Sequence, residues 1–322
     1  MIKVSIHFNF RVNIYHEKQP AIAKAKFSKK DFYQICTTTI KQMGETVSRS
    51  TRENYLTALR SLRRFTGEDL PVECINNSMI RGYERWLRDK GVCLNTISCY
   101  MRSLRSILCK ALPVEICMEK AFDGVYTGRA STEKRSVSQQ VIGKLKKLQL
   151  NHCPRLAMAR DIFLFCFYAQ GMPFVDLAYL RQSQMADRRL IYHRHKTGTR
   201  ICVALQPCMR KIADRYRPAT GDYVFPILTS TEPEQAYTEY MTALNWYNRS
   251  LKQLARLAGI SDNLTSYTAR HSWATAAYHA NIELPVISKA LGHSNPQTTL
   301  TYLREIDDQR LEEASEKIVN SV

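Results

Sequence analysis

Glycine is scarce in this sequence, at 12 of 322 residues, which excludes a collagen-like repeat. No run of apolar residues is long enough to cross a lipid bilayer. The first twelve residues alternate apolar and polar side chains and lack the unbroken apolar core of a secretion signal. We therefore expect a soluble, cytoplasmic protein with no membrane partner.

Cysteine pairs at the spacing of a metal site are also missing. The chain has ten cysteines, but none of them forms a C-x-x-C pair. Several lie within apolar stretches, as Cys109 and Cys166 do. We expect free thiols that act as small hydrophobic side chains in a reducing compartment, and we predict no metal site.

Acidic residues are few beside the basic ones. The 29 Asp and Glu face 47 Lys and Arg, which gives a formal net charge of +18. Hydrophobic residues make up 44% of the chain, which excludes a disordered protein. An excess of positive charge on a folded chain indicates a polyanionic partner, most commonly nucleic acid.

The length of 322 residues predicts two domains. The first is helical by its apolar spacing, and we assign it to 29–117. One helix is predicted over 54–65. A second is capped by Ser78 and ends at Gly91, and a third is capped by Asn95.

Two of these predicted helices carry arginines on the side opposite their apolar face. Arg60, Arg63 and Arg64 share one side because they are three and four residues apart. Arg102 and Arg105 do the same on the other helix. A solvated surface explains either set alone, but two sets in one basic domain favour contacts with DNA phosphates.

The spacing of apolar residues changes after residue 117. Residues 118–137 are polar, lack helical spacing and contain two glycines, which predicts a linker. Ser138 is expected to cap the first helix of a second domain over 138–305, and a charged tail follows over 306–322. Alternating apolar residues around a Lys-Thr-Gly-Thr turn predict a β-hairpin over 190–205. The expected fold class is mainly α with a small β-hairpin.

Three pieces of the second domain follow one another in order. They are Arg270-His-Ser-x-Ala-Thr, then Leu-Gly-His293-Ser, then Tyr302, nine residues after the histidine. This order and spacing resemble the tyrosine recombinase (phage integrase) family, over about residues 30–305. The stretch 171–180 further resembles integrases of bacterial conjugative elements. The resemblance implies a two-domain clamp on duplex DNA, with a helical SAM-like core-binding domain and a catalytic domain.

The resemblance also implies a reaction. A tyrosine attacks a DNA phosphodiester, forms a 3′-phosphotyrosine and releases a 5′-hydroxyl, with no metal, ATP or other cofactor. Tyr302 matches the nucleophile, and Arg270 matches the second family arginine, which clamps the phosphate. His293 matches the histidine that bonds the phosphate. Arginine suits this role because its fork donates two hydrogen bonds to phosphate oxygens.

Two further residues match functional residues of the family, and one family residue, the first arginine, is missing. Lys196 matches the lysine that protonates the leaving oxygen, and Asp176 matches the acid that supports the first family arginine. Where that arginine belongs, the chain has Met172 followed by Pro173. A related branch uses an arginine two residues before the lysine, and Arg194 fits that place. Residues two apart on a strand share a face, so we hypothesise that Arg194 and Lys196 project together.

A second departure is Tyr267, where the family usually has a histidine three residues before the arginine. A tyrosine hydroxyl bonds as donor and acceptor but does not shuttle protons near pH 7. Proton transfer then depends on His293 or His271, or Tyr267 only positions the phosphate.

Two other functions remain open at this point. A transcription regulator with a helix–turn–helix would use the turn around Gly292 and Pro296. A type IB topoisomerase would share the phosphotyrosine chemistry but act as a monomer.

A recombinase instead usually works as a homotetramer on two DNA sites, with or without accessory DNA-bending proteins. The tail would suit packing onto a neighbouring protomer through Ile306, Leu311 and Ile318. Residues 1–28 are a basic extension, short for a separate domain that reads additional DNA sites.

Overall fold

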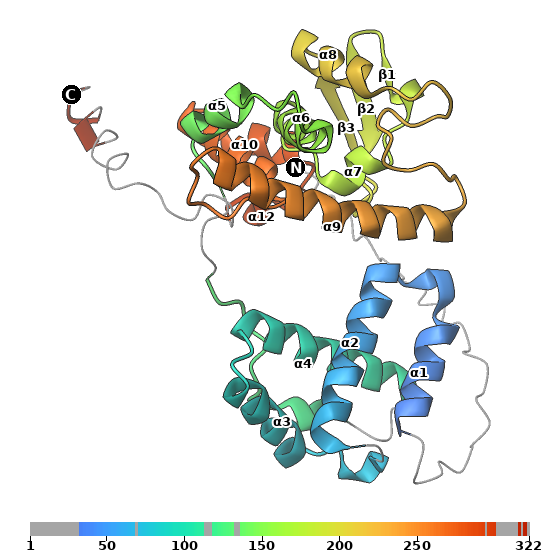
Figure 1. The fold of residues 1–322 in the computed structure, drawn as a ribbon. Coiled ribbons are helices and arrows are strands. Elements are labelled where there is room, and N and C mark those ends of the chain that lie inside the picture. Colours follow the sequence, from blue (N-terminus) through green and yellow to red (C-terminus); the bar gives the residue numbers. More distant parts are fainter. Residues whose placement is uncertain are drawn as a thin grey trace, which may run out of the picture. The chain divides into compact units, whose positions relative to one another are not determined.

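The computed structural model describes residues 32–67, 70–112, 118–131, 136–293, 295–300, 315–316 and 318–320. The chain divides into two compact units, Met1–Thr132 and Glu133–Val322 (Figure 1). Over the described residues, no helix has the length and apolar character needed to span a membrane. The predicted extension 1–28 lies outside the described residues.

The described part of the first unit is helical. Its α-helices pack around one apolar core, in which α4 contacts both α1 and α2. The α-helices are α1 (Phe32–Gln42), α2 (Arg49–Thr66), α3 (Asn77–Asp89) and α4 (Leu94–Ala111). Short 3₁₀ turns connect them: η1 (Gly44–Thr46), η2 (Val72–Cys74) and η3 (Met118–Phe122).

The three helices predicted in this unit are confirmed, but their starts differ. Helix α3 is capped by Asn76, whose side chain accepts the backbone N–H of Met79, and Ser78 lies inside the helix. Helix α4 begins before Asn95, whose amide group instead binds the backbone of Ala130. An earlier start lengthens each helix, and a polar residue near a helix start does not by itself identify the cap.

The predicted linker begins too early. Ala121, Phe122 and Val125 are buried in the core of the first unit. The Asn77 side chain donates to the carbonyl oxygens of Ala121 and Asp123, which fixes this segment against α3. Three apolar residues without helical spacing gave no signal of burial in the sequence, so the packed part of 118–137 was missed.

The second unit surrounds one central helix. Helix α6 is buried over Asp161–Cys166, and it contacts α5, α8, α9 and α10. The α-helices are α5 (Gln139–Lys147), α6 (Pro154–Tyr168), α7 (Phe174–Ala178), α8 (Pro207–Tyr216), α9 (Pro233–Leu257), α10 (Thr268–His279), α11 (Leu284–Leu291) and α12 (Pro296–Leu300). The expected fold class, mainly α with a small sheet, is confirmed.

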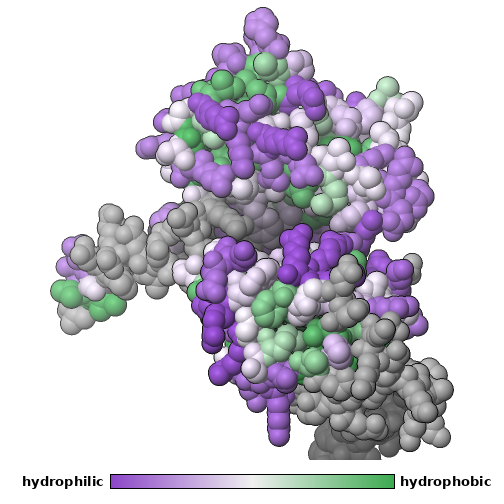
Figure 2. All heavy atoms as spheres, turned by 60° about the horizontal axis from the view of Figure 1, so that its bottom comes forward, coloured by the Kyte–Doolittle hydropathy of each residue, from purple (hydrophilic) through white to green (hydrophobic). Residues whose placement is uncertain are grey.

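A three-stranded antiparallel sheet interrupts these helices. It contains β1 (Met185–Ala186), β2 (Arg189–His193) and β3 (Arg200–Ala204), with β2 in the middle. The predicted hairpin is therefore confirmed, and its loop covers 194–199. Figure 2 shows that hydrophilic side chains cover much of the visible surface of both units, with smaller apolar patches between them.

Candidate active site

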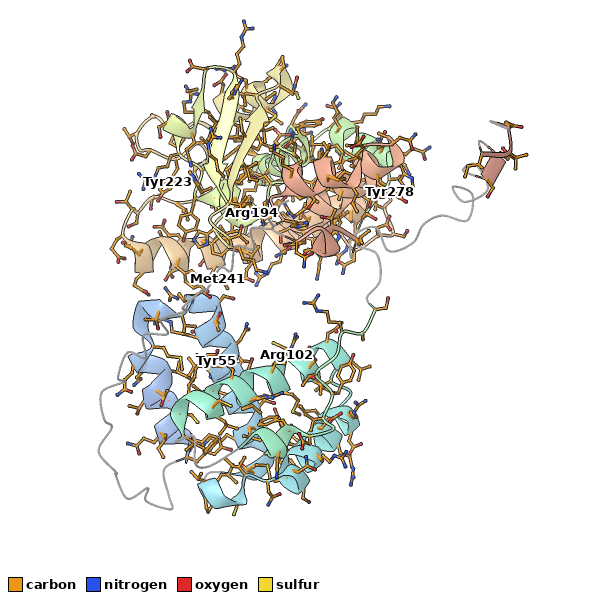
Figure 3. All side chains as sticks on the ribbon, turned by 180° about the vertical axis from the view of Figure 1, so that it is seen from behind. Tyr55, Arg102, Arg194, Tyr223, Met241 and Tyr278 are labelled. Atoms are coloured by element: carbon orange, nitrogen blue, oxygen red, sulfur yellow. The ribbon has the colours of Figure 1, made fainter. Side chains whose placement is uncertain are left out.

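Two buried arginines of the second unit converge on one backbone oxygen. Arg270, on α10, is 1% exposed, and its Nη2 donates to the carbonyl oxygen of Leu291 at 2.6 Å. Arg194, just after β2, is 6% exposed, and its Nη1 donates to the same oxygen at 2.7 Å. Figure 3 shows Arg194 at the end of the β-hairpin, inside the unit. The acceptor ends α11, where the helix dipole concentrates partial negative charge that offsets two neighbouring cations.

Asp176 places a carboxyl group beside these arginines. Its side chain is completely buried, and its Oδ2 lies 2.8 Å from the Nε of Arg194, as an ion pair without good hydrogen-bond alignment. Its Oδ1 accepts the backbone N–H of His195 at 2.8 Å. Burial raises the pKa of Asp176, while the His195 N–H and the charge of Arg194 act in the opposite direction. The sequence predicted that Asp176 supports the first family arginine. In the structure its carboxylate contacts Arg194.

His293 connects Arg270 to helix α12. Its Nε2 lies 3.0 Å from Arg270 Nη2, and its Nδ1 lies 2.9 Å from the Oγ1 of buried Thr299. Because a guanidinium only donates, Nε2 is the acceptor, and Nδ1–H then donates to Thr299. Burial, followed by the charges of Arg270, Arg194 and Lys196, lowers the pKa of His293 to about 4. The imidazole is therefore neutral at pH 7.

Two glycines allow the backbone to approach the arginines closely. Gly171 has φ +72°, its carbonyl accepts from Arg270 Nη1 at 3.0 Å, and an added Cβ would lie 2.9 Å from the Arg270 Cα. Gly292 has φ +66°, and an added Cβ would lie 2.6 Å from Ile201 Cδ1 and 3.3 Å from Arg194 Cγ. Both positions need a left-handed backbone, and at Gly171 the backbone of Arg270 leaves no room for a side chain.

Arg194 and Lys196 both lie in the hairpin loop, but Arg194 is buried and Lys196 is exposed. Strand β2 ends at His193, so the alternation that we used to place both residues on one face does not apply, and that part of the hypothesis is wrong. Arg194 turns inward, with its backbone N–H donating to Thr199 O at 2.8 Å, while Lys196 is exposed in the turn. Lys196 nevertheless acts electrostatically on the site, since its charge contributes to the low pKa of His293.

The position of the missing family arginine holds no charge. Met172 is fully buried in the core of the unit, and its backbone N–H donates to Cys166 O at 3.0 Å. Pro173 begins the turn into α7. Two arginines lie close by: Arg270 donates to the carbonyl oxygen of Gly171, and Arg194 pairs with Asp176 of α7.

The remaining predicted residues lie around the start of α10 or beyond the described chain. Tyr267 precedes α10 and is half-buried, with its ring centroid 5.5 Å from that of His271. Tyr302 lies outside the described residues, as do Ile306 and Leu311 of the tail. Sequence reasoning missed Thr299, although it lies only three residues before Tyr302 and is tied to His293.

The arginines predicted to contact DNA in the first unit are all exposed. On α2, Arg60 is paired loosely with Glu53 at 3.9 Å. On α4, Arg102 is labelled in Figure 3, and its Nε donates to the carbonyl oxygen of Ser98 at 3.3 Å. The exposed set is Arg60, Arg63, Arg64, Arg102 and Arg105. Among the described residues of both units, no cluster of His, Cys, Asp and Glu has a composition that could hold a metal ion.

Two known family profiles match the chain. The profile of the "Phage integrase family" matches residues 142–309. The chain belongs to the phage integrase family, the tyrosine recombinases. A second profile, the "Phage integrase SAM-like domain", matches residues 31–129. The resemblance that the motifs indicated is confirmed.

Curated relatives are tyrosine recombinases of moderate similarity. XerD of Oceanobacillus iheyensis is 23% identical over 235 residues, which are 71% of this chain and 77% of the relative. XerA of Pyrococcus furiosus is 31% identical over 58% of this chain and 62% of the relative. XerC of Chromohalobacter salexigens is 35% identical over 49% of this chain and 52% of the relative. These matches therefore cover between about half and three quarters of the relatives.

Solved structures with the same fold are integrases. A lambda integrase dimer bound to a COC′ core site has a TM-score of 0.65 at 16% identity, over 85% of this chain and 97% of that one. The Tn1549 transposon integrase in complex with transposon right end DNA has a TM-score of 0.63 at 13% identity, over 88% and 99%. A lambda integrase tetramer bound to a Holliday junction has a TM-score of 0.65 at 15% identity, over 85% and 78%.

Proposed function

We propose that this tyrosine recombinase cleaves and rejoins duplex DNA at specific sites through a phosphotyrosine formed by Tyr302. The observation that carries the proposal is the convergence of Arg270 and Arg194 on one oxygen, with His293 beside them. Two adjacent guanidiniums suit the non-bridging oxygens of a phosphate, where negative charge grows in the transition state.

In the proposed step, side chains of the protein itself supply the nucleophile and move the protons. The Oη of Tyr302 attacks phosphorus, the bond from phosphorus to the 5′-oxygen breaks, and Lys196 protonates the departing oxygen. The phenol proton passes to His271 or to His293, and Tyr267 positions the phosphate. The products are a 3′-phosphotyrosine and a free 5′-hydroxyl, and the reverse reaction rejoins a strand. This step uses no metal, ATP or other cofactor.

Arg194 takes the part of the missing first arginine in this proposal. Its support is the ion pair with buried Asp176 and the shared contact with Leu291. Replacing Arg194 with alanine should reduce strand cleavage about as strongly as replacing Arg270. If Arg194→Ala leaves cleavage intact while Arg270→Ala abolishes it, Arg194 has no such role.

We further propose that the partner is duplex DNA gripped by both units as a clamp, with the exposed arginines of α2 and α4 on the phosphates. By analogy with the lambda integrase tetramer, two bound sites would be held by a homotetramer, and accessory DNA-bending proteins would assist. The tail over 306–322 would pack onto a neighbouring protomer. Removing 308–322 should abolish tetramers and spare DNA binding by the monomer. Synapsis that survives this truncation would contradict exchange of the tail.

The first test uses the native host, where the protein would act on DNA in the cytoplasm, at the nucleoid. Wild-type protein and Tyr302→Phe are expressed separately, and long sequencing reads are searched for new DNA junctions. Junctions seen only with the wild type support recombination, and their geometry names the outcome. A flipped segment indicates an invertase, and a circle or a new insertion indicates an integrase of a mobile element. Equal junctions in both strains would contradict a role for Tyr302.

A further inference from the structure

Lys196 is the one member of the candidate active site that lies exposed in a turn without a bond of its own. No hydrogen bond or ion pair to a described residue holds its ammonium group. Arg270, Arg194 and His293, in contrast, are each fixed by hydrogen bonds. The place of the Lys196 side chain is therefore set by its neighbours in the hairpin loop 194–199.

The backbone of this loop closes on itself. The carbonyl oxygen of Arg194 accepts the N–H of Gly198 at 2.8 Å and that of Thr197 at 3.3 Å, and the N–H of Arg194 donates to Thr199 O at 2.8 Å. These bonds fix the shape of the turn around Lys196. Because all of them lie within the loop, they do not fix where the turn stands relative to the rest of the site.

Asp176 attaches the loop to α7 at one point. Its Oδ1 accepts the backbone N–H of His195 at 2.8 Å, and its Oδ2 lies 2.8 Å from the Nε of Arg194. Both contacts involve one carboxyl group on two consecutive loop residues. A turn attached at a single point can still rotate about it, so a second attachment is needed to fix the direction of Lys196.

The ring of His195 provides this second attachment. His195 is exposed, and its ring centroid lies 5.2 Å from that of Tyr179, with an angle of 35° between the rings. This separation is within the range of favourable aromatic contacts. We call these two side chains the Tyr179–His195 pair. Since His195 directly precedes Lys196, the pair holds the loop at the residue beside the lysine.

Tyr179 is itself held by the body of the second unit. It directly follows α7, three residues after Asp176, and is half-buried. Its ring centroid lies 6.1 Å from that of Tyr240 on α9, and it packs against an apolar cluster that contains buried Tyr223 and Leu228. The pair thus connects an exposed loop to a packed part of the protein.

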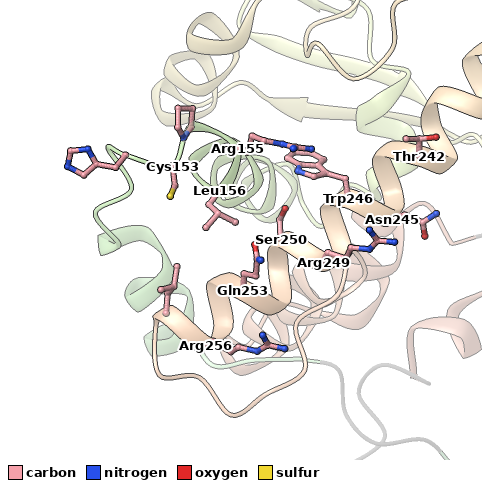
Figure 4. Close-up of a pocket in the computed structure, with 13 residues that line it drawn as sticks. Cys153, Arg155, Leu156, Thr242, Asn245, Trp246, Arg249, Ser250, Gln253 and Arg256 are labelled. Carbon is pink, nitrogen blue, oxygen red and sulfur yellow. The ribbon is translucent and has the colours of Figure 1, made fainter.

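The Tyr179–His195 pair is separate from the pocket drawn in Figure 4. Residues within 152–156 and 242–257 line that pocket, and neither member of the pair is among them. The arginines of the pocket are Arg155, Arg249 and Arg256. A substitution at His195 leaves these arginines in place, so it should preserve the attraction of this surface for a polyanion.

We propose that His195 and Tyr179 are positioning residues for Lys196, whose ammonium group their stacked rings hold within reach of the leaving 5′-oxygen. This inference rests on the proposed function, because it assumes that Lys196 protonates that oxygen. A general acid must lie within hydrogen-bond reach of the atom that it protonates. His195 serves here as a flat ring and not as a carrier of protons.

The test uses two duplexes that carry the site identified by junction mapping. In the second duplex, sulfur replaces the bridging 5′-oxygen of the bond that is cut. An alcohol resembles water, whose pKa is about 15.7, so its oxygen needs a proton in order to leave. A thiol has a pKa of about 8.5, so the bond from phosphorus to sulfur breaks with both electrons on sulfur and without a proton.

The two duplexes should respond differently to loss of the ring. In single-turnover cleavage at saturating protein, His195→Ala should cut the ordinary duplex about 10- to 10²-fold more slowly than the wild type, as expected for a misplaced acid. It should cut the sulfur duplex at the wild-type rate. Lys196→Ala should lose about 10²–10⁴-fold on the ordinary duplex and recover in the same way. His195→Phe keeps a ring and should keep both wild-type rates.

Two further variants serve as controls. His279→Ala removes another exposed histidine, whose ring centroid lies 6.0 Å from that of Tyr278, and should change neither rate. Tyr179→Leu removes the other ring of the pair and should reproduce His195→Ala, and the double variant should be no slower than either single one. Melting curves of all variants confirm that they fold.

Three results would overturn the inference alone. The first is a wild-type rate for His195→Ala on the ordinary duplex. The second is a defect of His195→Ala that persists on the sulfur duplex while Lys196→Ala recovers, which would mean a general loss of structure. The third is His195→Phe as slow as His195→Ala, which would assign a proton transfer to the imidazole.

Two other results would reach the proposed function as well. If sulfur does not restore Lys196→Ala, Lys196 is not the acid, and no residue positions it for that role. A wild-type protein that cuts neither duplex would remove the proposed reaction together with this inference.

Discussion

Arg270 of the second unit and Arg60 of the first are the same residue type in opposite surroundings. Arg270 is 1% exposed and is fixed by Gly171, Leu291 and His293. The side chain of Arg60 on α2 is 63% exposed and touches one carboxylate at 3.9 Å. The buried arginines are oriented before any phosphate arrives, which is what stabilising a transition state requires. The exposed ones can adapt to a backbone, which suits affinity.

The largest expected difference between buried and exposed arginines is the stability lost when their ion pairs are broken. Asp176→Asn leaves Arg194 buried beside a neutral group, and breaking a buried pair in this way costs about 3–5 kcal/mol of stability. Asp222→Asn breaks the exposed pair with Arg181, 3.3 Å long, and should cost about 0–1 kcal/mol. Urea unfolding of both variants measures the two values, and similar losses would remove the distinction between the two environments.

The next effect concerns the rate of cleavage. Arg270→Lys keeps a charge but loses the planar fork that reaches three partners, so cleavage should fall about 10²–10³-fold. Arg102→Lys, in the first unit, should leave the rate at saturating protein unchanged. Single-turnover cleavage of a site identified by junction mapping compares them, and equal rates would show that orientation of Arg270 is unimportant.

A pH effect follows from the neutral imidazole among these arginines. The pKa of His293 is about 4 in the folded protein, below its ordinary value of 6.5, so the unfolded chain binds more protons between these values. This contribution to stability is complete above pH 6.5 and is lost as the pH falls from about 6.5 to about 4. His293→Gln should flatten the stability curve in that window. Urea unfolding at successive pH values tests this, and parallel curves for the two proteins would contradict it.

The smallest effect is expected on the exposed face of α4. Arg102→Ala should reduce the salt slope of duplex binding by about 0.9, one phosphate contact, with no measurable change in the free energy of unfolding. Salt-dependent binding and urea unfolding give the two values. A large loss of stability would mean that this arginine is structural.

Sequence reasoning succeeded where a short pattern fixes the geometry. The period of two predicted the hairpin, and motif spacing brought Arg270 and His293 to one site. It did not predict that Arg194 and Arg270 share the carbonyl oxygen of Leu291. A backbone oxygen is present at every residue, so no sequence pattern marks this one. The strand rule also failed for Arg194, because alternation ends where the strand ends, at His193.

The bond between His293 and Thr299 has a consequence for Tyr302, the nucleophile of the proposed reaction. Thr299 belongs to α12, and Tyr302 follows three residues later. The imidazole thus bonds Arg270 through one nitrogen and α12, the helix that precedes Tyr302, through the other. In the proposed reaction, binding of a phosphate at Arg270 and placement of Tyr302 share this imidazole. By thermodynamic linkage, a coupling between the two would be equal in both directions.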